Sequence, residues 1–415
     1  MGPTHPTEHT GGHFTELPGG PAGGACTVIG MLSGTSHDAV DAAAATLWFE
    51  EPDTVVLRPL GARGEPFPPG LRDEVAACLP PAATSAAALC RLDTRLGRFF
   101  GEAAARANAE LAGGRAGLVA SHGQTIYHWV DGGRAHGTLQ LGGPAWIAEA
   151  TGLPVVSDLR TRDIARGGHG APLAAMLDAL WLPGDGRRRG ALNLGGIANL
   201  TIPGDDGGPP LAYDLGPANA LLDAAVAEAT GGAARMDTGG ARAARGRVDA
   251  ALLAALLAEP YYRLPPPKST GKELFHAGYL RRHTEGRALA LDDLAATLTE
   301  LTARLVADAC RAHRLEELVV SGGGVRNPTL MARIGALAAP ARVTTSAAHG
   351  LPADAKEAYL FALLGFLSLH GLPGSLPSAT GARAPALLGS FTPGAGPLRL
   401  PEPRGRPPRR LRVAA

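Results

Sequence analysis

The sequence is short of aromatic residues and of net charge, and both shortages exclude classes of partner. Phe, Trp and Tyr make up 5% of the 415 residues, and the formal net charge is +1. Aromatic platforms that stack bases and broad basic faces that hold nucleic-acid phosphates are therefore not expected. The one basic cluster, residues 404–412, is predicted to be a solvated tail, with nucleic-acid contact as the less favoured alternative.

Cysteine is scarce as well, and no long apolar run occurs. The four cysteines show no C-x-x-C pair and no histidines at zinc spacing, so we interpret them as small buried hydrophobes in a reducing compartment. No apolar stretch reaches the roughly 18 residues of a membrane span. The N-terminus lacks the charged and apolar regions of a secretory signal. These absences predict a cytoplasmic protein.

Glycine and proline, by contrast, are abundant, with 57 and 35 residues, and they separate alternating strand and helix patterns. This alternation predicts an α/β fold with a mixed sheet in each of two lobes. Predicted strands include residues 27–31, 39–48 and 117–121, and predicted helices include 85–111, 292–313 and 355–370. The predicted divisions are a disordered N-terminal extension (1–24), lobe I (25–120, with a returning segment at about 371–394), lobe II (121–370) and a disordered tail (395–415).

Three glycine-rich turns, at residues 26–36, 191–201 and 318–328, each follow a short apolar run. Glycines after strands let backbone N–H groups approach phosphate oxygens closely. None of the turns is a Walker P-loop, and together they suggest a nucleotide held between two lobes. The candidate nucleotide-binding residues in these turns are Gly34, Thr35, Ser36, His37, Asp38, Ala39, Val40, Asp41, Asn193, Gly195, Gly196, Gly322, Gly323, Gly324 and Asn327.

The first turn also carries two carboxylates that are candidates to hold Mg²⁺, directly or through water. These are Asp38 and Asp41. The alternative is a β-hairpin whose polar side chains merely satisfy the turn.

Two further segments are candidates to bind a polar or anionic substrate. His122 and Gln124 follow a predicted strand, where side chains commonly face the cleft of an α/β sheet, although a structural histidine is equally compatible. Arg160 and Arg162 lie beside a glycine-rich loop and offer bidentate forks for a carboxylate. The alternative for the arginines is a surface ladder of salt bridges.

Asp214 is the candidate general base. It precedes a Gly-Pro turn and a helix, which would hold its carboxylate still and partly screened from water; an N-cap is the alternative role. Lys268 and Lys272, after three prolines, either screen phosphate charge or are solvated loop residues.

In order along residues 27–393, these segments resemble the anhydro-N-acetylmuramic acid kinase family of the actin/hexokinase/Hsp70 superfamily. The shared motifs are S-G-T-S-x-D, S-H-G-Q-T, D-x-R-x-R-D-x-A-x-G-G-x-G-A-P-L, N-x-G-G-I-A-N-L, D-x-G-P-x-N, P-K-S-T-G-[RK]-E, G-G-G-x-R-N-P and L-P-S-x-T-G-A. The resemblance implies two actin-like (ribonuclease H-like) lobes closing on ATP and Mg²⁺, and a homodimer. The implied reaction opens 1,6-anhydro-N-acetylmuramic acid with water and phosphorylates O6 during cell-wall recycling.

The resemblance also implies roles for individual residues. Asp214 would activate the water, and Glu357 matches a family acidic residue near the sugar. Residues expected on the sugar side are His122, Gln124, Arg160, Arg162 and Asn219. Two alternatives are a kinase for another anhydro-sugar such as levoglucosan, and a nucleotide- or sugar-binding protein without turnover.

The sequence departs from the family pattern close to several of these positions. Ala39 replaces a usual glycine and would be strained if its φ were positive. Leu215 and Ala218 replace the usual Thr and Gly near Asp214, and His169 replaces a usual Gln. None of these changes removes a proposed catalytic group.

Overall fold

The computed structural model describes residues 24–34, 37–50, 53–80, 82–183, 186–204, 208–266, 268–271 and 274–414. Almost all of the predicted N-terminal extension lies outside these residues, and so do Thr35, Ser36 and Lys272.

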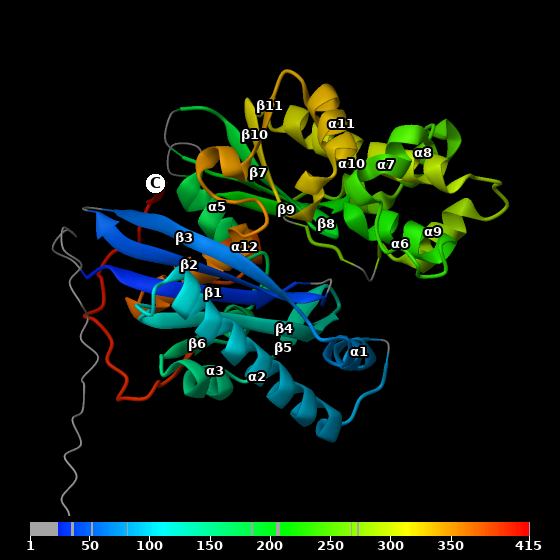
Figure 1. The fold of residues 1–415 in the computed structure, drawn as a ribbon. Coiled ribbons are helices and arrows are strands. Elements are labelled where there is room, and N and C mark those ends of the chain that lie inside the picture. The colour runs from blue at the N-terminus through cyan, green and yellow to red at the C-terminus, as the bar shows by residue number, and fades with distance from the viewer. Residues whose placement is uncertain are drawn as a thin grey trace, which may run out of the picture.

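Two β-sheets organise the chain, and Figure 1 shows them in separate parts of the molecule. The first has the order β12-β6-β4-β1-β2-β3-β13, with β5 paired to β4, and the second has the order β11-β10-β7-β8-β9. The strands of the first sheet are β1 (Cys26–Ser33), β2 (Ala39–Glu50), β3 (Thr54–Pro66), β4 (Leu118–Asp131), β5 (Arg134–Leu141), β6 (Val155–Ser157), β12 (Ser390–Thr392) and β13 (Arg410–Val413). Those of the second are β7 (Arg189–Leu194), β8 (Ile197–Ile202), β9 (Leu211–Pro217), β10 (Glu317–Ser321) and β11 (Arg342–Thr345).

The two sheets repeat one topology. In the first, β1, β2 and β3 form an antiparallel meander, and β4 and β6 then add in parallel on the other side of β1. In the second, β7, β8 and β9 form the meander, and β10 and β11 add in parallel beside β7. This repetition, for which the sequence shows no fixed period, confirms the predicted α/β fold of two actin-like lobes with mixed sheets.

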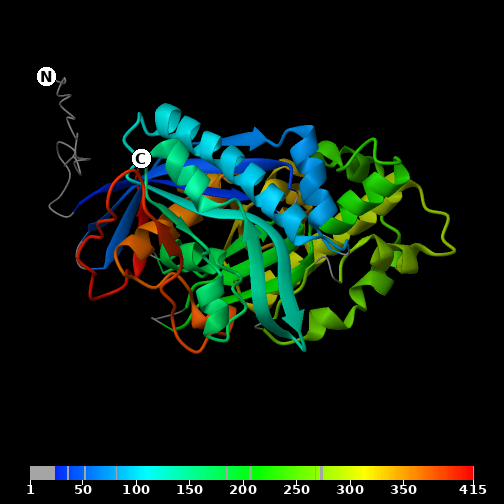
Figure 2. The same cartoon turned by 90° about the horizontal axis from the view of Figure 1, so that it is seen from below.

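Helices cover both faces of the first sheet. α12 (Lys356–Leu369) is apolar on every side and lies in the core on one face, with α5 (Ala174–Trp181) beside it. A Cβ on Gly30 of β1 would lie 2.0 Å from the Ala358 carbonyl oxygen, so only glycine lets this strand approach α12 so closely. The amphipathic α2 (Ala86–Leu111) covers the opposite face, together with α1 (Pro69–Cys78) and α3 (Pro144–Thr151) (Figure 2).

The second sheet packs one face on α10 (Leu291–Ala312) and α11 (Pro328–Ala338). α6 (Asn219–Ala229), α8 (Ala250–Leu257) and α9 (Ala277–Thr284) form a further apolar cluster with α10 at the end of the molecule away from the first sheet (Figure 1). The remaining helices are the short α4 (Thr161–Ala165), α7 (Ala241–Arg245) and α13 (Pro377–Thr380). Within the described residues, no helix combines the length and the apolar character that crossing a bilayer requires.

The predicted divisions of the chain need correction in three places. The chain passes from the first sheet to the second between β6 and β7, so the predicted boundary at residue 120 falls too early. α12 packs on the first sheet although it was assigned to lobe II, because its apolar surface fits against β1. The predicted tail ends in β13, which pairs in parallel with β3 and buries Leu411, so this part is ordered.

Candidate active site

A row of polar side chains crosses the second sheet on one face. Ser321 pairs with Asn193, Asn193 with Asn199, and Asn199 with Asp214, and directly paired residues project from the same face of a sheet. The neighbouring Leu192 and Leu194 point to the opposite face and enter the apolar core under α10. Because side chains alternate along each strand, one face of this part of the sheet is apolar and the other carries the polar side chains.

Asp214, in β9, is held by hydrogen bonds to both oxygens of its carboxylate. Oδ1 accepts from Asn199 Nδ2 at 2.8 Å, and Oδ2 accepts from Ser269 Oγ and from the Thr270 N–H, each at 2.9 Å. The side chain is only partly buried, so a reacting molecule can reach it. Asp214 is not an N-cap, because Ala218 occupies that position of α6.

The backbone of Lys268 contacts Asp214, and the Lys268 ammonium is bound by carbonyl oxygens of the protein. Its Nζ donates to the carbonyl oxygens of Tyr261 and Tyr262, at 3.1 and 2.9 Å. These contacts favour neither alternative that the sequence left open for Lys268.

Glu357 joins the same polar row from the first turn of α12. Its Oε1 accepts from Asn193 Nδ2 at 3.3 Å. The carboxylate is exposed, but the protein around it displaces part of its water, and this desolvation raises its pKa. The charges of the nearby Lys356 and Arg160 act in the opposite direction and lower the pKa. The preceding residue, Lys356, forms a buried ion pair with Asp178 of α5 at 2.5 Å and anchors this end of α12.

On the sugar side, the structure joins two predicted residues, His122 and Arg160. Arg160 Nε donates to His122 Nε2 at 2.7 Å, so the imidazole carries its proton on Nδ1 and donates it to the Gly123 carbonyl oxygen at 3.1 Å. Burial, together with the Arg160 charge, lowers the pKa of His122 to about 3, so this histidine is neutral. A second Arg160 nitrogen donates to the Gly170 carbonyl oxygen at 2.6 Å. His122 thus positions an arginine that lies within the electrostatic reach of Glu357.

The other predicted sugar-side residues make contacts elsewhere. Arg162 is exposed and donates to the Leu387 carbonyl oxygen at 3.4 Å. Gln124 is buried and accepts from Ser33 Oγ at 2.6 Å. Asn219 donates to the carbonyl oxygens of Leu194 and Gly195, so it braces the second glycine-rich turn.

The first glycine-rich turn places its carboxylates near Glu357. Asp41 lies near Asp38, Glu357 and Asp354, and its partial burial and these like charges raise its pKa to about 6, although Arg326 opposes them. Within the described residues, no group of three or more Asp, Glu, His or Cys side chains is arranged to hold a metal ion.

The strain considered for Ala39 is absent. Outside glycine, positive φ angles among the described residues occur at His37, Asp158 and Arg314, and Ala39 instead begins β2 in register with Pro66. Ala218 has a φ of −106°, so it also tolerates a side chain.

The second and third glycine-rich turns contact each other. A Cβ on Gly322, whose φ is +85°, would lie 2.4 Å from Asn193 Oδ1, and one on Gly324 would lie 2.5 Å from the Leu194 Cβ. These glycines are therefore required by the approach of the two turns. Asn327 is buried and caps α11 by accepting from the Leu330 N–H at 3.0 Å, a structural task for a residue predicted to bind ATP.

Asn199, Ser269 and Lys356 are among the residues of the site that were not identified from the sequence. The signal for Asn199 was present, because alternation in Ile197–Ile202 places it on the face of Asn193. Ser269 and Lys356 reach the site only through contacts between distant segments.

A family model described as "Anhydro-N-acetylmuramic acid kinase" matches residues 26–394. A protein of that name from Streptomyces coelicolor is 60% identical over 387 residues, covering 93% of this chain and 98% of its own. Another from Coxiella burnetii is 41% identical over 368 residues, covering 88% and 96%. Among solved structures, a ROK family glucokinase from Streptomyces griseus in complex with glucose and AMPPNP aligns with a TM-score of 0.37 and 15% identity, covering 82% of this chain and 99% of its own.

Proposed function

The chain belongs to the anhydro-N-acetylmuramic acid kinase family, and on this premise we propose that it opens 1,6-anhydro-N-acetylmuramic acid and phosphorylates O6 with ATP. Water attacks C1, the bond between C1 and the bridging oxygen breaks, and that oxygen, now O6, takes the γ-phosphoryl group. The products are N-acetylmuramic acid 6-phosphate and ADP, which fits a role in cell-wall recycling.

The observation that carries the proposal is the polar row from Glu357 through Asn193 and Asn199 to Asp214. Asp214 accepts the proton of the attacking water, and its hydrogen bonds to Ser269 and Thr270 fix the orientation of its carboxylate. Glu357 lies at the opposite end of the row, beside the first glycine-rich turn, where sugar and γ-phosphate would meet. Phosphoryl transfer itself asks the protein mainly for position and charge stabilisation.

Mg²⁺ fits this site as a companion of ATP. Asp38 and Asp41 carry like charges close together, and a divalent cation would relieve their repulsion. Mg²⁺ usually keeps several waters and takes one or two carboxylates plus substrate phosphates, so a cage of three protein ligands is not required. When bound, the ion would neutralise charge on the transferring phosphoryl group.

Arg160 favours an anionic sugar over a plain anhydro-hexose. Its guanidinium is largely buried, and removal from water lowers its pKa to about 10 although Glu357 and Asp163 oppose this shift. A buried cation gains from a carboxylate partner, which the lactyl group of the muramyl sugar supplies and levoglucosan lacks. Arg162, which contacts Leu387, is given no role in this recognition.

We also propose a cytoplasmic homodimer. All four cysteines are free thiols, which suits a reducing compartment. Light scattering on the purified chain would measure its oligomeric state.

Asp214→Asn is the first test. It keeps the size of the side chain but removes the base, so kcat should fall by about 10²–10⁴-fold. ATP binding, measured by calorimetry, should remain near the wild-type affinity. The assay couples ADP release to 1,6-anhydro-N-acetylmuramic acid, with levoglucosan in parallel. Near-wild-type turnover of the variant would refute the role of Asp214, and turnover on levoglucosan alone would refute the substrate.

A further inference from the structure

We propose that Lys268 is a positioning residue that locks residues 268–270 around Asp214; this rests on the proposed role of Asp214 as the base. The loop supplies two donors to the Asp214 carboxylate, Ser269 Oγ and the Thr270 N–H. Those donors are useful only if the loop is held still, and Lys268 is its anchor.

The Lys268 ammonium is held by the short helical turn η3 (Pro260–Arg263). Lys268 Nζ donates to the carbonyl oxygens of Tyr261 and Tyr262, at 3.1 and 2.9 Å, which are charge-assisted hydrogen bonds. The ammonium also lies 4.8 Å from the centre of the Tyr261 ring and 5.9 Å from that of Tyr213, within the range of cation–π attraction. Two carbonyls and two aromatic rings, from the two segments η3 and β9, thus surround the cation.

The backbone completes the lock. The Asp214 N–H donates to the Lys268 carbonyl oxygen at 3.1 Å, and the Tyr261 hydroxyl donates to the Asp214 carbonyl oxygen at 2.8 Å. Tyr261 therefore touches both Lys268 and Asp214. Direct contacts thus link the ammonium through Tyr261 to the backbone of Asp214.

The position of β9 explains why Asp214 needs such a lock. β9 is the edge strand of the second sheet, so β8 bonds it on one side only. The backbone of residue 268 takes the hydrogen bond that a further strand would otherwise make with Asp214. A base on an unsupported edge would move by more than catalysis tolerates, since a displacement of about 1 Å can cost about 10²-fold in rate.

The central test is Lys268→Met, which keeps much of the aliphatic stem and removes the ammonium. We expect kcat to fall by about 10- to 100-fold, from misplacement of the base, with little change in the KM for ATP. Lys268→Arg, which restores a cation with several donors, should recover part of kcat. The matched control is Arg263→Met, which removes an exposed cation from the same turn and should leave kcat unchanged.

Ser269→Ala tests the same loop independently, in case the Lys268 variants lose activity because they fail to fold. Ser269 is exposed, so the melting temperature should not change, while loss of one donor should lower kcat several-fold. Wild-type kcat in both Lys268→Met and Ser269→Ala, with Asp214→Asn inactive, would overturn the inference and leave the proposed function standing. An active Asp214→Asn would refute the proposed function itself. A lower melting temperature in Lys268→Met with wild-type kcat for the folded fraction would reduce Lys268 to a structural role and overturn the inference.

Discussion

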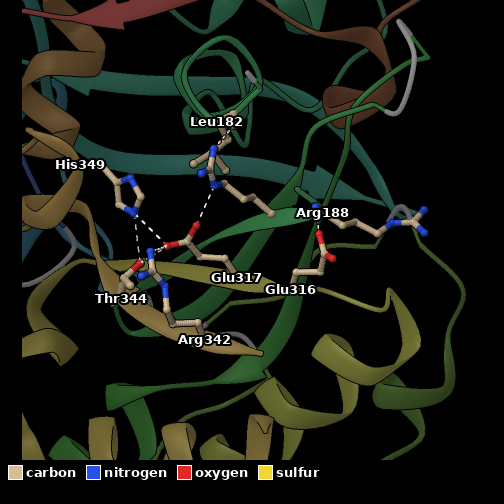
Figure 3. Close-up of polar contacts among 8 residues, drawn as sticks. Leu182, Arg188, Glu316, Glu317, Arg342, Thr344 and His349 are labelled. Carbon is tan, nitrogen blue, oxygen red and sulfur yellow. Dashed lines mark hydrogen bonds and ion pairs between the residues drawn. The ribbon is translucent and has the colours of Figure 1, made fainter. Parts of the chain in front are cut away.

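Strands β7 and β10 carry polar groups at both of their ends. Opposite charges are paired where the strands begin, whereas carboxylates lie near one another where the strands end. Where the strands begin, Glu317 is paired in register with Arg189, and its carboxylate also receives Arg342, Thr344 and His349 (Figure 3). Burial alone would raise the pKa of Glu317, but the hydrogen bonds from Arg189 and Arg342 outweigh it and lower the pKa to about 2.

Where the same strands end, carboxylates gather, and the nearby Arg160, Lys356 and Arg326 only partly offset the cost of their charge. Asn193 and Ser321 are neutral, and Glu357 and Asp41 both have raised pKa values, chiefly because the protein around them displaces water from the two carboxylates. The first end is built for stability, because every charge meets a partner. The second end keeps unfavourable charge that ATP, a metal ion and the sugar would relieve, which is characteristic of functional sites.

Among substitutions at the two ends of these strands, Glu357→Gln should give the largest effect. It should lower kcat without lowering stability. Loss of the charged group that we propose to lie beside the sugar is expected to lower kcat by about 10²–10³-fold. The melting temperature should stay the same or rise, because the substitution relieves crowding with Asp41. Coupled ADP release and thermal unfolding measure the two quantities. A variant that unfolds at lower temperature while retaining kcat would place Glu357 among the structural carboxylates.

Glu317→Gln should give the opposite result. The substitution breaks buried ion pairs by removing the carboxylate that Arg189 and Arg342 both contact, so the free energy of unfolding should fall by about 3 kcal/mol while kcat is unchanged. Urea unfolding measures this loss. Because folding lowers the pKa of Glu317 from 4.5 to about 2, its contribution is complete above pH 4.5 and disappears as the pH falls towards 2.

The adjacent Glu316→Gln is the matched control, since Glu316 is exposed and accepts a hydrogen bond from the Arg188 N–H (Figure 3). It should cost less than about 1 kcal/mol. Equal losses of unfolding free energy in Glu317→Gln and Glu316→Gln would show that the ion pairs of Glu317 stabilise the fold no more than an exposed hydrogen bond does.

The strands and helices that depend on local sequence signals were predicted from the sequence. Apolar runs ending in glycines located β1, β7 and β10, and long periodic patterns located α2, α10 and α12. Which sheet a strand joins depends on pairing between distant segments, so the boundary between lobes was set too early. β13 carried a weak signal, the alternation Arg-Leu-Arg-Val, but only the edge of β3 shows what Leu411 packs against.

The site divides in the same way. Asp214, Glu357, His122 and Arg160 were identified from motifs, and the structure groups His122 with Arg160 and Glu357 with Asn193. The partners that hold Asp214 were not predicted, because Ser269 lies 55 residues away in sequence. Glycines near the third turn were predicted to serve the nucleotide, although their packing against Asn193 and Leu194 already requires them.

Asp41→Asn should give the smallest effect and the most direct measure of the uncompensated charge. Folding raises the pKa of Asp41 from 3.8 to about 6, so the wild type binds more protons when folded and loses stability as the pH rises from about 4 to 6. The variant has no such loss, so without ligands at pH 7.5 it should be more stable by about 1 kcal/mol, or about 2 °C in melting temperature. The difference should vanish at pH 4, where both side chains are neutral in the folded state. Asp73→Asn, at an exposed position of α1, is the control and should show no such pH dependence. A stabilisation of the Asp41 variant that persists at pH 4, or a lower melting temperature at pH 7.5, would contradict the view that this end of the strands holds unrelieved charge.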